Sequence, residues 1–381
     1  MRSLSISFVL AISAVSLPDA AIAQEATAQA NSAGKSNANQ YVCALKSSVA
    51  AGAVSHEAAK AVGPELGQVL FVYSHAVKGF AVRLPASPGR NGAAALRMHN
   101  SNIRSCVPDG ITRAVGGFAG RPIRPAGQST PWGVDRVGGP TDASASVHKA
   151  WIIDSGIDLT HPDLNVDAAD GASFLTSDSS LNDANGHGTH VAGIIAAKNN
   201  TIGVVGVAAG APVVPVRVLD ASGTGPDSGV IAALDYVYQH AAPGDVVNLS
   251  IQADAVDSTF DDAVLALGAA GVFVTVAAGN NGADASNYSP SRANGPNVFT
   301  VSAFGKLDTW ASFSNYGPSV DWGEPGVNVP STYKNGGYAT LSGTSMAAPH
   351  LAGILLAIGA AQSGGLVKRD PDGNPDNIGV K

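Results

Sequence analysis

From Trp132 to the end of the chain, short apolar runs alternate with longer segments whose apolar residues recur at helical spacing. The runs at 150–153 and 272–277 are apolar throughout, whereas 228–239 has the helical pattern. Strands without polar alternation are buried on both faces, which is typical of a parallel sheet lying between helices. The pattern therefore predicts an α/β layered fold with a mostly parallel sheet.

This region is predicted to contain five strands and four helices. The strands are expected at 150–153, 213–219, 246–251, 272–277 and 298–303, and the helices at 187–197, 228–239, 260–270 and 345–361. The region spans about 254 residues, which is enough to bury a large core. It contains no cysteine, so thiol chemistry is excluded there.

Residues 1–23 have the pattern of a secretory signal peptide. Arg2 provides a positive start, residues 4–17 an apolar stretch, and residues 21–23 (Ala-Ile-Ala) a cleavage site. A buried N-terminal helix is the alternative. Removal of the signal would place the protein in an oxidising compartment, secreted or periplasmic. No apolar run reaches the roughly 18 residues of a membrane span, so we expect no membrane partner once the signal is removed.

Residues 24–39 are rich in Ala, Asn, Gln and Ser and are interpreted as a linker. A small folded unit is expected at about 40–112, and residues 113–127, rich in Gly, Arg and Pro, are interpreted as an exposed linker and cleavage zone. The expected elements of the unit are strands at 41–45, 68–73, 79–84 and 103–107 and helices at 54–62 and 93–98.

The β-α-β-β-α-β order of this unit is that of a ferredoxin-like α+β fold. Such a fold pairs its first and last strands, which would make Cys43 and Cys106 cross-strand neighbours. We therefore predict a disulfide between them. Two buried free thiols are the alternative.

The two parts of the chain carry opposite charges. Residues 1–127 hold 12 basic and 5 acidic residues, a net charge of +7, whereas residues 128–381 hold 10 and 24, a net charge of −14. The acidic larger part argues against a nucleic-acid partner. The asymmetry also indicates two pieces with different roles.

Three residues in the larger part are of the types needed for nucleophilic catalysis. Asp154 ends an apolar strand, His187 lies between two glycines at a helix start, and Ser345 lies at the start of the last helix. A serine nucleophile needs a base, and the base needs an orienting group. Taken singly, each residue is more often a cap, a turn former or a surface group.

Taken together, the segments IDSGI (153–157), HGTHVAG (187–193) and GTSMAAPH (343–350) resemble the signature blocks of the subtilisin-like serine proteases. The order Asp, His, Ser is that of subtilisin, and the resemblance covers essentially all of residues 128–381. It implies a subtilisin-like three-layer fold and a serine endopeptidase. In that enzyme Ser345 attacks the scissile carbonyl, His187 transfers the proton, and Asp154 orients His187.

The resemblance also implies an oxyanion hole and a substrate groove. Asn280 matches the oxyanion asparagine, with the backbone N–H of Ser345 as second donor. An extended peptide would pair with two edge segments. The residues implied for this groove and its first pocket are Gly223, Thr224, Gly225, Ser250, Ile251, Gln252, Ala277, Ala278 and Gly279.

The pocket wall implied in this way is small and apolar. We therefore expect broad specificity with a preference for bulky apolar or aromatic residues before the cut. Gln252 stands where the family usually has glycine, and it would narrow the mouth of the pocket. His190, one helical turn after His187, is expected to be a packing residue.

A structural calcium site is a further implication of the resemblance. The segment KNNTIGV (198–204) resembles the calcium loop of the family, and QSTPWGV (128–134) its mature N-terminus. Mixed oxygen ligands of this kind suit calcium. The implied ligands are the side chains of Gln128, Asp163 and Asn200 and the backbone carbonyls of Lys198, Ile202 and Val204.

The small unit resembles, more weakly, the inhibitory propeptides of the family, mainly through residues 75–84. This implies a self-processing zymogen whose propeptide (24–127) acts as intramolecular chaperone and inhibitor, with the catalytic domain at 128–381. A first cut near Asp109–Gly110 with trimming to Gly127 is one route. The opposite charges would attract the two parts. We expect a monomer acting on protein and peptide substrates.

Three other functions fit parts of this pattern. The first is a catalytically silent subtilase fold used for binding, against which the intact Asp154, His187, Ser345 and Asn280 argue. The second is an α/β-hydrolase esterase, whose G-x-S-x-G elbow is missing and whose triad order differs. The third is a peptide-ligating variant of the same fold, which the sequence leaves open.

Overall fold

The computed structural model describes residues 37, 39–86, 91–116 and 121–381. The predicted signal peptide and most of the predicted linker 24–39 lie outside the described residues. All that follows concerns the unit Asn39–Lys381.

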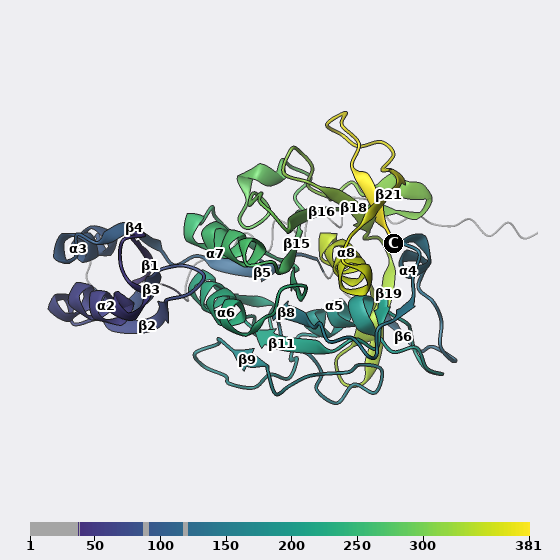
Figure 1. Cartoon of the computed structure of the whole chain (residues 1–381), viewed down its shortest axis with the longest axis horizontal. Helices are drawn as coiled ribbons and strands as arrows, with labels where there is room; N and C mark the ends of the chain where they lie inside the picture. The colour runs from purple at the N-terminus through teal and green to yellow at the C-terminus, as the bar shows by residue number, and fades with distance from the viewer. Residues whose placement is uncertain (1–36, 38, 87–90, 117–120) are drawn as a thin grey trace, which may run out of the picture. The chain divides into compact units, whose positions relative to one another are not determined.

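A large, mostly parallel sheet runs through the region from residue 150 onward (Figure 1). Its parallel strands lie in the order β11 (Val213–Arg217), β8 (Ala150–Asp154), β13 (Val246–Leu249), β15 (Phe273–Ala277), β16 (Val298–Gly305) and β18 (Trp322–Pro325). Short strands extend it at the edges: β9 (Ala172–Ser173), β17 (Thr309–Trp310), β22 (Asn377–Val380) and β21 (Gln362–Leu366).

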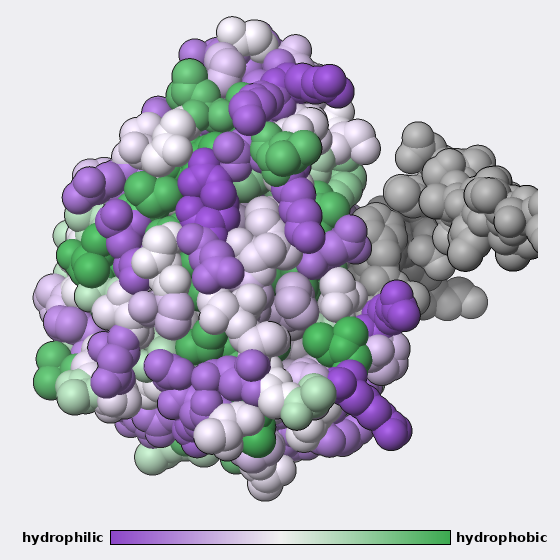
Figure 2. All heavy atoms as spheres, turned by 90° about the vertical axis from the view of Figure 1, so that its right-hand side faces the viewer, coloured by the Kyte–Doolittle hydropathy of each residue, from purple (hydrophilic) through white to green (hydrophobic). Residues whose placement is uncertain are grey.

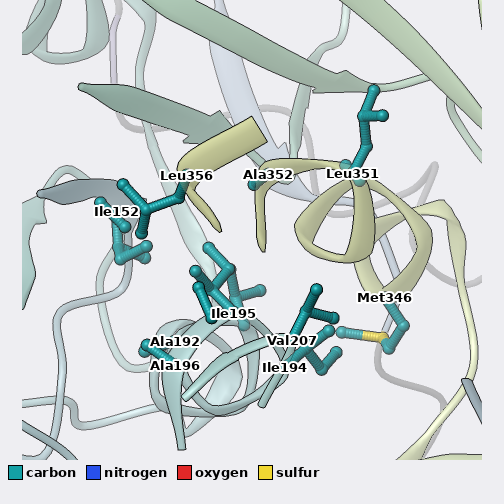
Figure 3. Close-up of a cluster of buried hydrophobic side chains, with 14 of the residues drawn as sticks. Ile152, Ala192, Ile194, Ile195, Ala196, Val207, Met346, Leu351, Ala352 and Leu356 are labelled. Carbon is teal, nitrogen blue, oxygen red and sulfur yellow. The ribbon is translucent and has the colours of Figure 1, made fainter. Parts of the chain in front are cut away.

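Helices cover both faces of this sheet. α5 (His187–Ala196) and α8 (Thr344–Ile358) share one apolar core with one face, and α6 (Asp227–His240) and α7 (Ser258–Ala269) share a second core with the other. Figure 3 shows α5 beside α8, with Met346 of α8 pointing toward Ile194 of α5. The expected three-layer α/β fold is confirmed.

The N-terminal region forms the expected α+β unit. Its antiparallel sheet has the order β2-β3-β1-β4 and carries its own apolar core. The elements are β1 (Gln40–Leu45), α2 (Val54–Val62), β2 (Gln68–Tyr73), β3 (Gly79–Arg83), α3 (Gly92–His99) and β4 (Ile103–Pro108). Cys43 is the register partner of Cys106 across β1 and β4, and a disulfide joins the two residues.

The prediction that residues 113–127 form an exposed linker is wrong for its first residues. β5 (Ile111–Ala114) lies between β12 (Thr224–Pro226) and β14 (Ile251–Ala253), antiparallel to both, and Val115 is buried. β6 (Arg121–Ile123) pairs with β20 of the hairpin formed by β19 (Val329–Tyr333) and β20 (Gly337–Leu341). Main-chain pairing with open strand edges needs no particular side chains, so composition alone does not reveal it.

Element boundaries differ from the predicted ones for local reasons. α7 begins at Ser258, two residues earlier than predicted, because the Asp257 carboxylate accepts hydrogen bonds from the N–H groups of Thr259 and Phe260. α8 ends at Ile358 because Gly359 adopts a φ of 75°, a left-handed helix stop. The remaining short elements are α4 (Trp132–Arg136), β7 (Thr141–Asp142) and β10 (Ala208–Ala209).

On the face drawn in Figure 2, hydrophobic side chains of the described residues lie singly among polar ones and form no continuous patch. In the described ranges, no helix has both the length and the apolar character to span a bilayer.

Candidate active site

The structure brings Asp154 and His187 into contact. Asp154 is the last residue of β8, and His187 the first residue of α5. Nδ1 of His187 lies 2.9 Å from each carboxylate oxygen of Asp154. Gly188 makes this approach feasible, because a β-carbon there would lie 2.2 Å from the carbonyl oxygen of Gly156. The signature glycine therefore serves a close contact between helix and strand end.

The environment of His187 favours its protonated form. Burial disfavours the charge, but the charge of Asp154 and its hydrogen bond outweigh that cost, so the pKa of His187 is raised. Within the described part of the chain, Nε2 of His187 has no hydrogen-bond partner. The ring thus has one nitrogen held by a carboxylate and the other free to exchange a proton.

Ser345, the second residue of α8, lies beside a peptide of the same chain. Its Oγ contacts the carbonyl oxygen of Val115 and donates to the carbonyl of Ser250 at 3.1 Å. Its backbone N–H donates to the same Val115 oxygen at 3.2 Å. Ser345 is buried, and Val115 is one of the residues that cover its hydroxyl.

Asn280 is held so that its amide nitrogen remains available. Its Oδ1 accepts hydrogen bonds of 2.9 Å from both the N–H and the Oγ1 of Thr344. Nδ2 has no partner among the described residues, and a β-carbon at Gly116 would lie 3.2 Å from it. A fixed donor therefore faces the peptide that Ser345 contacts, as an oxyanion hole requires.

The predicted groove residues lie on both sides of β5. Ala114 donates its N–H to the Gly223 carbonyl at 3.0 Å, and Val115 donates to the Ser250 carbonyl at 3.0 Å. Thr224 and Gly225 are register partners of Arg113 and Thr112 on one side. Ile251 and Gln252 are partners of Ala114 and Arg113 on the other. The chain thus holds one of its own segments as a third strand between two edges.

The residues predicted for the first pocket lie together at the end of β15. Ala277 and Ala278 are buried, and Ala277 belongs to the same apolar core as Val115. A β-carbon at Gly279 would lie 2.3 Å from Oε1 of Gln252, so the Gln252 side chain lies against this wall. Its Nε2 donates to Oδ1 of Asn281 at 3.1 Å, which anchors it there.

Sequence reasoning missed several residues of the site. Asp254 binds the guanidinium of Arg113 through two hydrogen bonds of 2.9 Å. Thr344 anchors Asn280, and Asp183 accepts hydrogen bonds from Ser155, Gly186 and Thr189 beside Asp154 and His187. Asp254 directly follows β14, two residues after Gln252, so its place next to a predicted groove residue was the available signal. His190, expected to be a packing residue, is buried with Nε2 3.1 Å from the Ala339 carbonyl.

The residues predicted to bind calcium are linked to one another by hydrogen bonds. Gln128 Nε2 donates to the Lys198 carbonyl at 2.9 Å, Asn200 Nδ2 donates to Asp163 Oδ1 at 2.7 Å, and the N–H of Val204 donates to Asp163 Oδ2 at 3.2 Å. Asn200 Oδ1 accepts from the N–H of Ile202 at 2.7 Å. The loop therefore folds around the Asp163 carboxylate.

The surroundings of Asp163 fit a hard cation. Asp163 is buried, burial raises the pKa of its carboxyl, and its oxygens accept hydrogen bonds from Asn200 Nδ2, the Val204 N–H and the Tyr338 hydroxyl. A carboxylate together with amide and backbone carbonyl oxygens of the same segment is a donor set that calcium takes. Clusters of three or more His, Cys, Asp or Glu with metal-binding geometry are absent from the described residues. This absence does not argue against the predicted calcium site, because its six ligands include only one carboxylate, that of Asp163.

Comparison with known proteins identifies the family of this chain. The family described as "Subtilase family" matches residues 151–366, more than half of the chain. The chain belongs to the subtilase family. It is 45% identical to M-protease of Shouchella clausii (strain KSM-K16) over 231 residues, which is 60% of this chain and 59% of that protein. Subtilisin Savinase of Lederbergia lenta is also 45% identical, over 59% of this chain and 82% of that protein.

A solved subtilase has the same fold. The crystal structure of a cold adapted subtilisin-like serine proteinase superposes with a TM-score of 0.57 and 33% sequence identity. The match covers 65% of this chain and 96% of the other. The chain thus spans the subtilase fold and covers under two thirds of M-protease itself.

Proposed function

We propose that this subtilase is a secreted or periplasmic serine endopeptidase that is synthesised as a self-processing zymogen. The observation that carries the proposal is the arrangement around the Val115 carbonyl. Ser345 contacts it, Asn280 faces the next residue, and His187 is paired with Asp154. Such a constellation serves acyl transfer from a peptide to a serine.

The proposed roles are those of an Asp-His-Ser triad. Ser345 Oγ attacks the carbonyl carbon of the bound peptide while Nε2 of His187 takes its proton. Asp154 holds the imidazole through Nδ1 and stabilises the imidazolium. The N–H of Ser345 and Nδ2 of Asn280 stabilise the oxyanion, and His187 then protonates the leaving amine. Water hydrolyses the acyl-enzyme by the same steps in reverse.

Substrates bind as extended peptides between residues 223–225 and 250–252, as β5 does. Because this pairing uses the main chain of the substrate, we propose broad specificity. Bulky apolar or aromatic residues before the cut are favoured in a pocket lined by Ala277, Ala278 and Gly279. Gln252 lies against that wall and restricts it.

The N-terminal unit acts as propeptide: a chaperone for folding and an inhibitor that occupies the groove. It contacts the catalytic region through polar groups. Asp109 accepts from the N–H and Oγ of Ser228, Asp235 accepts from the N–H groups of residues 74–76, and Arg104 pairs with Asp262 at 2.6 Å. Mutual attraction of the basic and acidic parts favours this complex.

We propose that calcium stabilises the catalytic region through Gln128, Asp163, Asn200 and the carbonyls of Lys198, Ile202 and Val204. When bound, the ion would neutralise the Asp163 carboxylate and link the start of the region to the loop after α5. We further propose that the protein acts as a monomer, without nucleic-acid or membrane partners.

The test is hydrolysis of a fluorogenic peptide library by the purified enzyme. The wild type is expected to cleave internal peptide bonds, and the Ser345→Ala and His187→Ala variants to lose at least about 10³-fold in rate. The control is Ser363→Ala, since Ser363 is an exposed serine on β21. A wild type that binds peptides without cleaving them would be a silent subtilase, and the proposal would be wrong.

A further inference from the structure

The segment 111–116 lies in the groove as a substrate would. It pairs on both edges, with β12 on one side and β14 on the other. The N–H of Ala114 binds Gly223, and the N–H of Val115 binds Ser250. Only one carbonyl of this segment, that of Val115, accepts a hydrogen bond from the backbone of Ser345 within the described residues. The peptide presented to the nucleophile is therefore the bond between Val115 and Gly116.

Gly116 is adapted to the position after a cut. Its φ of 119° is a conformation that residues other than glycine rarely adopt. A β-carbon there would lie 3.1 Å from the Ser342 carbonyl oxygen and 3.2 Å from both Asn280 Nδ2 and Gly343 Cα. A larger residue would push the peptide away from the oxyanion donors.

Contacts with α6 and with the N-terminal unit fix the peptide at Asp109–Gly110. The Asp109 carboxylate caps the start of α6 at Ser228, with distances of 2.9 Å to the N–H and 2.6 Å to Oγ. The Asp109 N–H donates to the Gln40 carbonyl at 2.9 Å, within the N-terminal unit. These bonds attach Asp109 to two elements away from the nucleophile, so a first cut there would require both contacts to break.

The chain after the cut is already anchored. β6 (Arg121–Ile123) is paired with β20, and the N–H groups of Gln128 and Ser129 donate to the carbonyls of Thr201 and Gly203. Cleavage before Gly116 therefore leaves the catalytic region with its contacts from residue 121 onward unchanged. The released side keeps Thr112–Val115 paired in the groove, where it continues to block substrate.

We propose that the first self-cleavage of this chain occurs between Val115 and Gly116. The inference rests on the proposed function and names its first substrate. Ser345 Oγ bonds to the Val115 carbonyl carbon, the C–N bond to Gly116 breaks, and the proton from Ser345 passes through His187 to the new Gly116 amine. Water then cleaves the ester, which returns Ser345 and leaves a carboxylate on Val115.

The experiment follows processing of the full precursor by N-terminal sequencing and intact mass over time. The expected first products are a fragment ending at Val115 and one beginning at Gly116. Two matched variants test the site independently. Gly116→Ala is expected to slow the first cut at least about tenfold because of its φ and close contacts. Gly127→Ala is expected to leave it unchanged, because a β-carbon there meets nothing nearer than 3.8 Å.

The outcomes separate the inference from the proposed function. A first new N-terminus at Gly110 or Gln128, or a precursor slowed by Gly127→Ala and not by Gly116→Ala, overturns the inference while leaving an active endopeptidase. If Ser345→Ala precursor matures as fast as the wild type, self-cleavage is wrong at any bond. Loss of folding in Gly116→Ala would show as altered circular dichroism, and the wild-type sequencing result then decides alone.

Discussion

The carboxylate of Asp254 holds the guanidinium of Arg113 through two hydrogen bonds of 2.9 Å, Nε to Oδ1 and Nη2 to Oδ2. Arg113 is the third residue before the Val115–Gly116 bond, so we infer that Asp254 contacts the side chain at that position of a bound substrate. Both side chains are partly exposed, at 22% for Arg113 and 39% for Asp254. An exposed pair of this kind is worth about 0.2–1 kcal/mol.

Replacing Asp254 by Asn should therefore weaken selection of a basic residue at the third position. We expect kcat/KM to fall about two- to fivefold for peptides with Arg there and to stay unchanged for peptides with Ala. Asp262→Asn is the matched control, because Asp262 pairs with Arg104 outside the groove. An equal loss for Arg and Ala peptides would show that Asp254 acts on folding and not on recognition.

Asn280→Ala should lower kcat about 100- to 1000-fold with little change in KM, the loss known for the corresponding donor of subtilisin. The reason is that Nδ2 would bind the oxygen only when it becomes an oxyanion. The measurement is steady-state hydrolysis of a single peptide. Thr344→Val should give a smaller loss, since it removes the hydroxyl that orients the Asn280 amide. Unchanged kcat in Asn280→Ala would exclude this residue from the oxyanion hole.

Gln252→Gly should widen the first pocket, since the Gln252 side chain lies against Gly279. We expect the ratio of kcat/KM for Phe over Val before the cut to rise about tenfold, a typical effect of pocket size. Competing peptides that differ only at that residue provide the measurement. Gln362→Gly, on the exposed strand β21, is the control. Gln239→Gly would be a poor control, because Gln239 lies in helix α6. An unchanged ratio would mean that Gln252 does not limit the pocket.

Calcium removal should lower the thermal midpoint of the Ser345→Ala protein, which cannot digest itself. Without the cation, the buried charge of Asp163 loses its neutralising partner. Asp163→Asn should abolish the dependence of the midpoint on added calcium, whereas Asp135→Asn, at an exposed position, should preserve it. Equal midpoints with and without chelator in the Ser345→Ala protein would contradict a structural calcium site.

The bound propeptide should dissociate more readily as pH rises. Burial raises the pKa of Asp109 to about 6 and that of Asp227 to about 8. The Thr112 hydroxyl donates to Asp227, and the charges of Asp254 and Asp257 face the same cluster. Departure of the propeptide exposes both carboxyls to water, which returns their pKa values toward about 3.8, so the complex binds more protons than its separated parts. Its stability is greatest at low pH and falls as pH rises through about 4 to 8.

Size-exclusion chromatography of the processed protein at about pH 5.5 and pH 9 should show a dissociation constant at least about tenfold higher at the alkaline pH. Asp227→Asn should flatten this dependence, because the amide retains the acceptor for Thr112 and does not titrate. An unchanged pH profile in Asp227→Asn would assign the dependence to other groups.

Much of the site was accessible from sequence because its residues sit in short segments with strong local signals. Asp154 ends a strand that is apolar throughout, and His187 and Ser345 begin helices beside glycines. Strand ends of a parallel sheet meet at one edge, which made a joint site a fair expectation. The β-α-β-β-α-β order and the Cys43–Cys106 register followed from the same kind of local reasoning.

Other features depended on contacts between distant parts of the chain. In the sequence, nothing distinguishes Asp254 from other acidic residues. The fold places it opposite Arg113, which lies 141 positions earlier. The sequence predicted a linker around Val115. In the structure this segment is a bound strand, because Val115 is buried against Ser345, 230 positions later. Local periodicity therefore predicted the layers and the helices, and the resemblance of three short segments to the signature blocks of the subtilases implied the candidate triad. Only the tertiary structure decided which peptide the site holds. The reason is that main-chain pairing between strand edges depends little on side-chain identity, which is all that a sequence gives.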